Sequence, residues 1–167
     1  GVVAVAETPR PDLAAIDVRG AATVLVLDAV QDPGNFGTLI RSADAFGAVF
    51  AAVLPGTVDP WNPKAVRSAA GASFRVPILR LELAELMAWL RERGFALYGA
   101  DAAGTPVDRV SLAQRAALAV GNEGAGLGSA VREAADELIA VPQRGRADSL
   151  NVAVAAGILL FLLSRST

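Results

Sequence analysis

The chain has 167 residues, of which 53% are hydrophobic and 19% are charged, and its net charge is −2. This length fits one domain with one core, and this composition excludes a disordered chain. The chain contains no cysteine and no histidine, which excludes disulfides, a Cys/His zinc site and a Ser-His-Asp triad. The near-neutral charge differs from that of proteins that bind nucleic acid through bulk electrostatics.

Short apolar runs alternate with segments of helical spacing along the whole chain. In chain order we expect a strand at 24–28, a helix at 36–46, a strand at 49–54, a short helix within 61–72, a strand at 76–79, a helix at 81–93, strands at 95–100 and 117–120, a helix at 127–135, a strand at 137–141 and a helix at 151–164. This order predicts an α/β fold, in which a mostly parallel sheet carries helices on both faces. We assign 21–167 to this domain and interpret 1–20 as a linker-like segment after an upstream domain.

The last expected helix is apolar on nearly every side. Its apolar run, 152–163, is about half as long as a membrane span. We therefore expect this helix to be buried in protein, with part of it at a subunit interface. The N-terminal residues lack the basic leader and apolar stretch of a signal peptide, so we expect a cytoplasmic protein without a membrane partner.

Three loops follow expected strands, at the edge where parallel sheets usually bind ligands. The first loop, 28–37, contains Asn35, which can cap the next helix and so create an anion site at its N-terminus. Arg41 lies about one and a half turns further along that helix. A turn with a capping Asn35 and a solvated Arg41 is the alternative interpretation.

The second loop, Gly121–Gly128, is rich in glycine, which lets a ligand approach the backbone closely. It fails to match the dinucleotide fingerprint because Ser129 stands where the third glycine belongs, and this disfavours a nucleotide-dependent oxidoreductase. A flexible turn is the alternative interpretation, although such a turn does not require Glu123 at its centre.

The third loop, 141–151, ends with Ser149, a suitable N-cap for the final helix. Arg144 and Arg146 flank a glycine in this loop and could grip a phosphate. The alternative is a Ser149 that only caps the helix and two arginines that are only solvated.

Considered together, the loops are more specific than any one of them. Asn35 with Arg41, then Gly121-Asn-Glu-Gly-x-Gly-Leu127, then Val141-Pro142 and finally Ser149-Leu-Asn-Val-x-Val-Ala-Ala-Gly157 occur in this order. This pattern resembles the three motifs of the SpoU/TrmH family of RNA ribose 2′-O-methyltransferases, in the SPOUT superfamily. The resemblance covers roughly residues 20–165 of the chain.

The resemblance implies a SPOUT-type fold with a deep C-terminal trefoil knot, which topology rules alone would not predict. It further implies S-adenosylmethionine bound in the knot, a homodimer, an RNA substrate (rRNA or tRNA) and no metal. By the same resemblance, the polar active-site residues are Asn35, Arg41, Glu123, Ser149 and Asn151. The cofactor contacts are Ala100, Gly121, Val141 and Leu150, and the RNA contacts are Arg41, Arg144 and Arg146.

The resemblance points to Arg41 as the base that takes the proton of the 2′-hydroxyl. An arginine guanidinium remains protonated at neutral pH, and removing its proton costs much free energy. Arg41 is therefore better suited to hold phosphate and stabilise the developing alkoxide, with Glu123 or a phosphate oxygen as the final acceptor. A non-catalytic RNA-binding or assembly module that retained the fold is the alternative function.

Overall fold

The computed structural model describes the whole chain except residues 2–4, 6, 146–148 and 166–167. Its centre is one six-stranded sheet in the order β3-β2-β1-β5-β4-β6, in which the paired strands run parallel. The strands are β1 (Ala22–Leu27), β2 (Phe50–Val53), β3 (Ile78–Arg80), β4 (Ala96–Pro106), β5 (Arg115–Val120) and β6 (Glu137–Ala140). The helices are α1 (Pro33–Ala45), α2 (Pro63–Ser68), α3 (Leu83–Glu92), α4 (Ser129–Ala134) and α5 (Val152–Arg165), with short 3-10 helices η1 (Leu13–Ala15), η2 (Ala72–Phe74) and η3 (Val107–Arg109).

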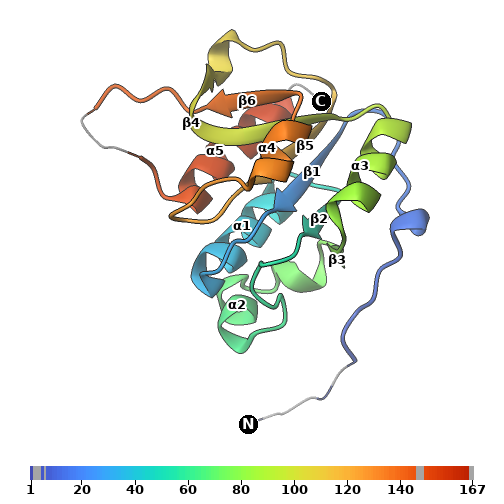
Figure 1. Ribbon diagram of the computed structural model, residues 1–167. Helices are drawn as coiled ribbons and strands as arrows, with labels where there is room; N and C mark the ends of the chain where they lie inside the picture. Colours follow the sequence, from blue (N-terminus) through green and yellow to red (C-terminus); the bar gives the residue numbers. More distant parts are fainter. Residues whose placement is uncertain (2–4, 6, 146–148, 166–167) are drawn as a thin grey trace.

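Helices cover both faces of the sheet, as the alternation of strands and helices predicts (Figure 1). The single core expected from the length is wrong, because the sheet separates two cores: alternate side chains of β1 point to opposite faces, with Leu25 in the core under α1 and α5 and Val24 in the core under α3 and α4. Every residue of β1 is buried, which is typical of a central strand in a parallel sheet. The predicted α/β class and mostly parallel sheet are therefore confirmed.

One strand extends beyond its predicted end. The strand expected at 95–100 continues to Pro106, and its pairing with β6 is interrupted by a shift between Ala100 and Thr105. At Gly104 a Cβ would lie 2.6 Å from the carbonyl oxygen of Leu138, so only glycine allows this close approach. The segment Asp101–Pro106 has little strand propensity, and its pairing depends on β6 rather than on its own residues.

Helix α2 is held tightly against the first turns of α1. A Cβ at Gly37 would lie 2.4 Å from Cβ of Ser68 and 2.6 Å from the backbone nitrogen of Ala69. The hydroxyl of Ser68 donates a hydrogen bond of 2.9 Å to the carbonyl oxygen of Gly34. This close packing fixes the exposed side of α2 next to the loop that follows β1.

The N-terminal segment packs partly against the domain. Leu13, Ile16 and Val18 are partly buried against the core under α3, although the sequence suggested a linker. Within the described ranges, no helix has the length and apolar character needed to cross a bilayer.

Candidate active site

The three loops selected from the sequence leave the carboxyl ends of β1, β5 and β6. The first lies between β1 and α1, the second between β5 and α4, and the third between β6 and α5. Strands β1 and β5 are direct neighbours in the sheet, so their loops emerge side by side. The structure therefore brings the motifs together at the edge where ligands bind in such sheets.

The carboxylate of Glu123 joins the second loop to the first. Its Oε1 accepts hydrogen bonds of 3.1 Å from the backbone N–H of Asp32 and from Nδ2 of Asn35. Its Oε2 accepts a longer bond of 3.3 Å from the backbone N–H of Gln31. Glu123 thus holds the first loop through three donors, a role that a flexible turn would not need.

Asn35 continues this connection to the third loop. Its Oδ1 accepts a hydrogen bond of 3.0 Å from Nδ2 of Asn151. The Oδ1 of Asn151 in turn accepts from the backbone N–H groups of Ala153 and Val154, at 2.9 and 3.3 Å. A chain of side chains, Glu123–Asn35–Asn151, therefore links all three loops.

Two predicted helix caps are wrong. Asn151, not Ser149, accepts from the first N–H groups of α5. Helix α1 begins at Pro33, earlier than predicted, and Asp32 caps it by accepting from the backbone N–H of Asn35 at 2.7 Å. Neither Asn35 nor Ser149 therefore caps a helix with its side chain. The side chain of Asn35 instead forms the hydrogen bonds that connect the loops.

The electrostatics of Glu123 follow from these contacts. Partial burial raises the pKa of the Glu123 carboxyl, but the hydrogen bonds from Asn35 and from the backbone, including Asp32 and Gln31, outweigh it. The pKa of Glu123 therefore lies below its ordinary value of about 4.5. A carboxylate with a lowered pKa is a weak base, so this environment suits a fixed hydrogen-bond acceptor.

The second loop folds back on itself so closely that it requires glycine. A Cβ at Gly121 would lie 2.2 Å from the carbonyl carbon of Gly126. Asn122 and Gly126 exchange two backbone hydrogen bonds of 2.9 Å, and Gly126 has a positive φ of 72°. The side chain of Asn122 accepts from the N–H groups of Gly124 and Ala125 and donates to the carbonyl oxygen of Ala29.

A cavity of about 340 Å³ opens beside this loop. Its lining includes the four residues expected to bind the cofactor, together with Ser149: Ala100, Gly121, Val141, Leu150 and Ser149. Its volume is within the range of small-molecule sites, about 300–1,000 Å³. Ile139, Val152 and Leu159 add an apolar wall.

Two oppositely charged side chains lie in the lining of the same cavity. Asp101 and Arg132 form an ion pair there. The backbone N–H of Ala103 and the guanidinium of Arg132 keep the pKa of Asp101 below its ordinary value, although partial burial opposes them. The cavity thus combines an apolar wall, exposed loop backbone and both signs of charge, which fits S-adenosylmethionine with its adenine ring and zwitterionic methionine end.

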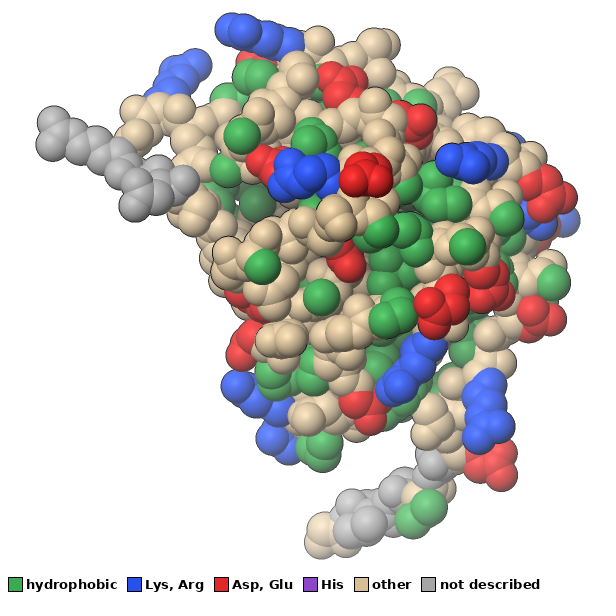
Figure 2. Space-filling view, viewed as in Figure 1, with side chains coloured by type: hydrophobic (Ala, Val, Ile, Leu, Met, Phe, Trp, Pro, Cys, Tyr) green, Lys and Arg blue, Asp and Glu red, His purple; other side chains and the backbone are tan. Residues whose placement is uncertain are grey.

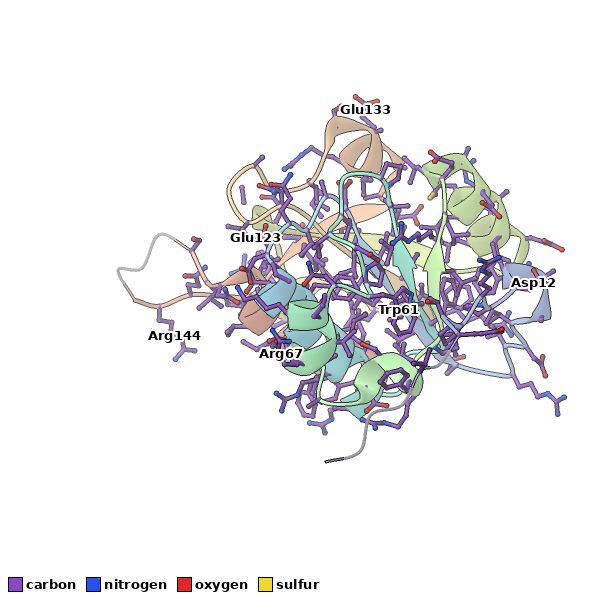
Figure 3. All side chains as sticks on the ribbon, turned by 90° about the horizontal axis from the view of Figure 1, so that it is seen from below. Asp12, Trp61, Arg67, Glu123, Glu133 and Arg144 are labelled. Atoms are coloured by element: carbon purple, nitrogen blue, oxygen red, sulfur yellow. The ribbon has the colours of Figure 1, made fainter. Side chains whose placement is uncertain are left out.

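The predicted arginines lie outside this connected group. Arg41 is exposed on α1, about 9 Å along the helix axis from Asn35, and no described residue forms an ion pair with it. Arg144 is exposed and projects from the loop after β6, away from the body of the molecule (Figure 3). Arg146 lies outside the described residues.

Some residues of the site were not identified from the sequence. Asn122 lies within the glycine-rich motif, where a side chain that bonds to its own loop is a recognised turn signal. Asp28 accepts from the backbone N–H of Gly128 at 2.7 Å and so ties the end of the same loop to β1. Asp101 and Arg132 are 31 positions apart, and no local pattern indicates that they pair.

Comparison with known proteins shows which family the chain belongs to. The model of the SpoU rRNA Methylase family matches residues 22–161. The chain belongs to the SpoU family. It is 44% identical over 163 residues to the 23S rRNA (guanosine(2553)-2′-O)-methyltransferase RlmP of Bacillus subtilis, covering 97% of the chain and 64% of that protein.

Other members of the SpoU family show the same likeness. The 23S rRNA (uridine(2479)-2′-O)-methyltransferase of Streptomyces viridochromogenes is 40% identical, covering 96% of the chain and 58% of that protein. The crystal structure of the SpoU methyltransferase AviRb from Streptomyces viridochromogenes in complex with AdoMet has a TM-score of 0.87 and 37% identity, covering 95% of the chain and 63% of that structure. The chain therefore spans less than two thirds of the length of each of these matches.

Proposed function

We propose that this SpoU protein transfers a methyl group from S-adenosylmethionine to a ribose 2′-hydroxyl of structured RNA, with rRNA favoured over tRNA. The observation that carries the proposal is the hydrogen-bonded chain Glu123–Asn35–Asn151, which joins the three motifs next to the 340 Å³ cavity. Relatives named as 23S rRNA 2′-O-methyltransferases and a neighbouring structure that contains AdoMet support it.

The proposed chemistry needs orientation more than acid–base strength. S-adenosylmethionine, when bound, supplies an activated methyl group, so the protein does not have to create an electrophile. In the proposal Ala100, Gly121, Val141 and Leu150 hold the cofactor, and Ser149 faces the reacting end. Correct alignment of two reactants can lower a barrier by about 7–11 kcal/mol, which suits a chain without histidine or cysteine.

We propose different roles for the two charged residues of the motifs. Glu123 positions Asn35 and the first loop, since three donors already occupy its carboxylate and its pKa is lowered. Arg41 binds the phosphate next to the target ribose and stabilises the developing alkoxide, because its guanidinium has no described partner. The 2′-hydroxyl proton then passes to a phosphate oxygen or to water. Arg144 and Arg146 would add contacts to RNA.

We further propose that the protein is a homodimer through α5. Val154, Ile158 and Phe161 are 51%, 38% and 43% exposed, and their spacing places them on one side of α5. Phe161 already packs against Phe46, at 5.7 Å between ring centroids. Sedimentation velocity would test this: Ile158→Glu should convert dimer to monomer, and a wild-type monomer would refute the dimer.

The family resemblance supports the remaining parts of the proposal. We propose that the chain between β6 and the end of α5 is threaded as a trefoil knot and that 1–20 connects the domain to an upstream RNA-binding domain. We propose that the protein acts in the cytoplasm on RNA. In this proposal the 167-residue chain binds S-adenosylmethionine by itself but methylates RNA slowly.

The proposed function is tested by binding and by product mapping. Calorimetry should detect S-adenosylmethionine binding, and labelled cofactor with unmodified total RNA should give a 2′-O-methyl group at a mappable site. Arg41→Lys should lower turnover and leave cofactor binding unchanged, whereas Arg91→Lys, on α3 across the sheet, should change neither. Binding of RNA without binding of S-adenosylmethionine would instead support the non-catalytic module. Near-normal turnover of Arg41→Lys would refute the need for a guanidinium.

A further inference from the structure

One stretch of this acidic chain is locally basic. Between Asp59 and Arg80 the sequence has four basic residues and one acidic residue, a net charge of +3, whereas the whole chain has −2. The stretch includes α2 and η2, and basic side chains gather over α2 at the lower end of the face in Figure 2. Three of the four basic side chains form ion pairs, Lys64 with Asp32, Arg75 with Asp44 and Arg80 with Asp59, and Arg67 has no acidic partner among the described residues.

An exposed aromatic pair lies within this stretch. The ring of Phe74 is 66% exposed, and it contacts the half-buried ring of Trp61 at 5.9 Å between centroids. Trp61 precedes α2 and Phe74 ends η2, so the two rings meet across the segment that contains α2. An aromatic ring that solvent can reach on one face is a platform for a planar ligand.

The aromatic pair borders a hollow. The cavity of about 280 Å³ at this place is lined by Trp61, Phe74 and Ser73, and by the N-terminal residue Arg10. Ser73 is only 3% exposed, and its hydroxyl has no hydrogen-bond partner among the described residues. The oxygen of this hydroxyl is itself closed off from solvent, so a ligand in the hollow would meet the rings of Trp61 and Phe74 and not this group.

Helix α2 connects this hollow to the proposed active site. Lys64 on α2 lies 3.7 Å from Asp32, which caps α1 directly beside Asn35. Arg67 on α2 is exposed and pairs with no described acidic residue, and in Figure 3 it lies below both Glu123 and Trp61. Helix α2 thus carries two basic residues in the segment between Trp61 and Phe74, and one of them, Lys64, reaches the loop beside the site.

We propose that residues 61–74 form a docking surface for a single-stranded segment of RNA next to the methylated nucleotide. One base stacks on Phe74 and Trp61, and Lys64 and Arg67 bind the phosphates that lead to the active site. Aromatic stacking combined with backbone cations is the usual way in which proteins bind single strands. The inference rests on the proposed function, since it assigns the RNA its path to that site.

The test measures binding of short single-stranded oligoribonucleotides without cofactor, so it does not depend on methyl transfer. Stacking should quench the fluorescence of Trp61. Trp89, the other tryptophan, lies on the buried side of α3, is 5% exposed and should not respond. Trp61→Phe should therefore abolish the quenching.

Two variants separate the base contact from the phosphate contact. Phe74→Ala should weaken binding by about tenfold without changing its salt dependence, and Phe74→Tyr should restore it. Arg67→Gln should reduce the slope of log affinity against log salt by about 0.7, as expected for one phosphate on a single strand. Arg91→Gln, a matched exposed arginine on α3, should leave both affinity and slope unchanged.

Several results would overturn the docking surface. Unchanged binding by Phe74→Ala in an enzyme that still methylates RNA would refute it and leave the proposed function intact. Equal quenching of Trp61 by a poly-aspartate peptide would assign the surface to an acidic protein partner. Quenching that depends on protein concentration in the absence of RNA would assign it to a second copy of the chain. Normal oligonucleotide binding in a chain that fails to bind S-adenosylmethionine would refute the proposed function alone.

Discussion

Replacing Gly121 with alanine would force a methyl group into the fold-back of the second loop. Its Cβ would lie 2.2 Å from the carbonyl carbon of Gly126 and 2.3 Å from the backbone nitrogen of Leu127. Carbon atoms in contact are normally about 3.5–4.0 Å apart, so the loop must open by more than about 1 Å. That movement breaks the two hydrogen bonds between Asn122 and Gly126.

The magnitude follows from these two effects. Two hydrogen bonds contribute about 1 kcal/mol each, and overpacking costs about 1–3 kcal/mol. The free energy of unfolding should therefore fall by about 3–5 kcal/mol. In a chain of this size that shift lowers Tm by about 10 °C. Urea and thermal unfolding would measure it, and calorimetry should show lost affinity for S-adenosylmethionine because Gly121 lines the cavity.

Gly124 provides the matched control within the same loop. A Cβ there would have Asn122 Oδ1 as its nearest neighbour, at 3.7 Å, and the backbone φ is not positive. Gly124→Ala should therefore change the free energy of unfolding by less than about 1 kcal/mol. Equal unfolding midpoints for the Gly121 and Gly124 variants would refute the steric reasoning.

Three further predictions concern the elements that hold the site. Gly37→Ala should lower the free energy of unfolding by about 1–3 kcal/mol, because α2 cannot move away from the new methyl group without losing the hydrogen bond from Ser68 to Gly34. Urea titration would measure this change, and an unchanged midpoint would contradict it. Asn151→Ala should cost about 1 kcal/mol in thermal unfolding through loss of the α5 cap, and Asn151→Ser should recover most of it; equal losses would argue against capping. Since the folded pKa of Glu123 is lowered, its stabilisation is complete above the ordinary value of about 4.5 and is lost as pH falls through the folded pKa. Glu123→Gln should therefore flatten the acid side of the stability profile, and an unchanged profile would show that Glu123 contributes nothing there.

The order of the elements and the position of the motif loops could be predicted because they depend on short-range patterns. Runs such as Val24–Leu27 are apolar throughout, and a chain that alternates them with helices must cover both faces of a parallel sheet. The same patterns placed Asn35, Glu123 and Ser149 at one edge. These predictions needed no knowledge of which side chains touch.

The contacts themselves could not be predicted, because several residues compete for the same role. Ser149 and Asn151 are both good N-caps, and only the start of α5 at Val152 selects Asn151. Asp32 and Asn35 compete in the same way at α1. The strand beyond Ala100 depends on pairing with β6, which local propensity does not encode.

The connection Glu123–Asn35–Asn151 also constrains how the protein can fold. Its partners are 88 and 116 residues apart in the chain, so the bond to Glu123 requires β1 and β5 to be paired, and the bond to Asn151 requires the start of α5 to be in place as well. Contacts of such long range form slowly, because the entropy of closing large loops must be overcome first. We therefore expect the site to be assembled late in folding, and a partly folded chain to lack these hydrogen bonds altogether. Cofactor affinity would then report complete folding more faithfully than secondary-structure content does.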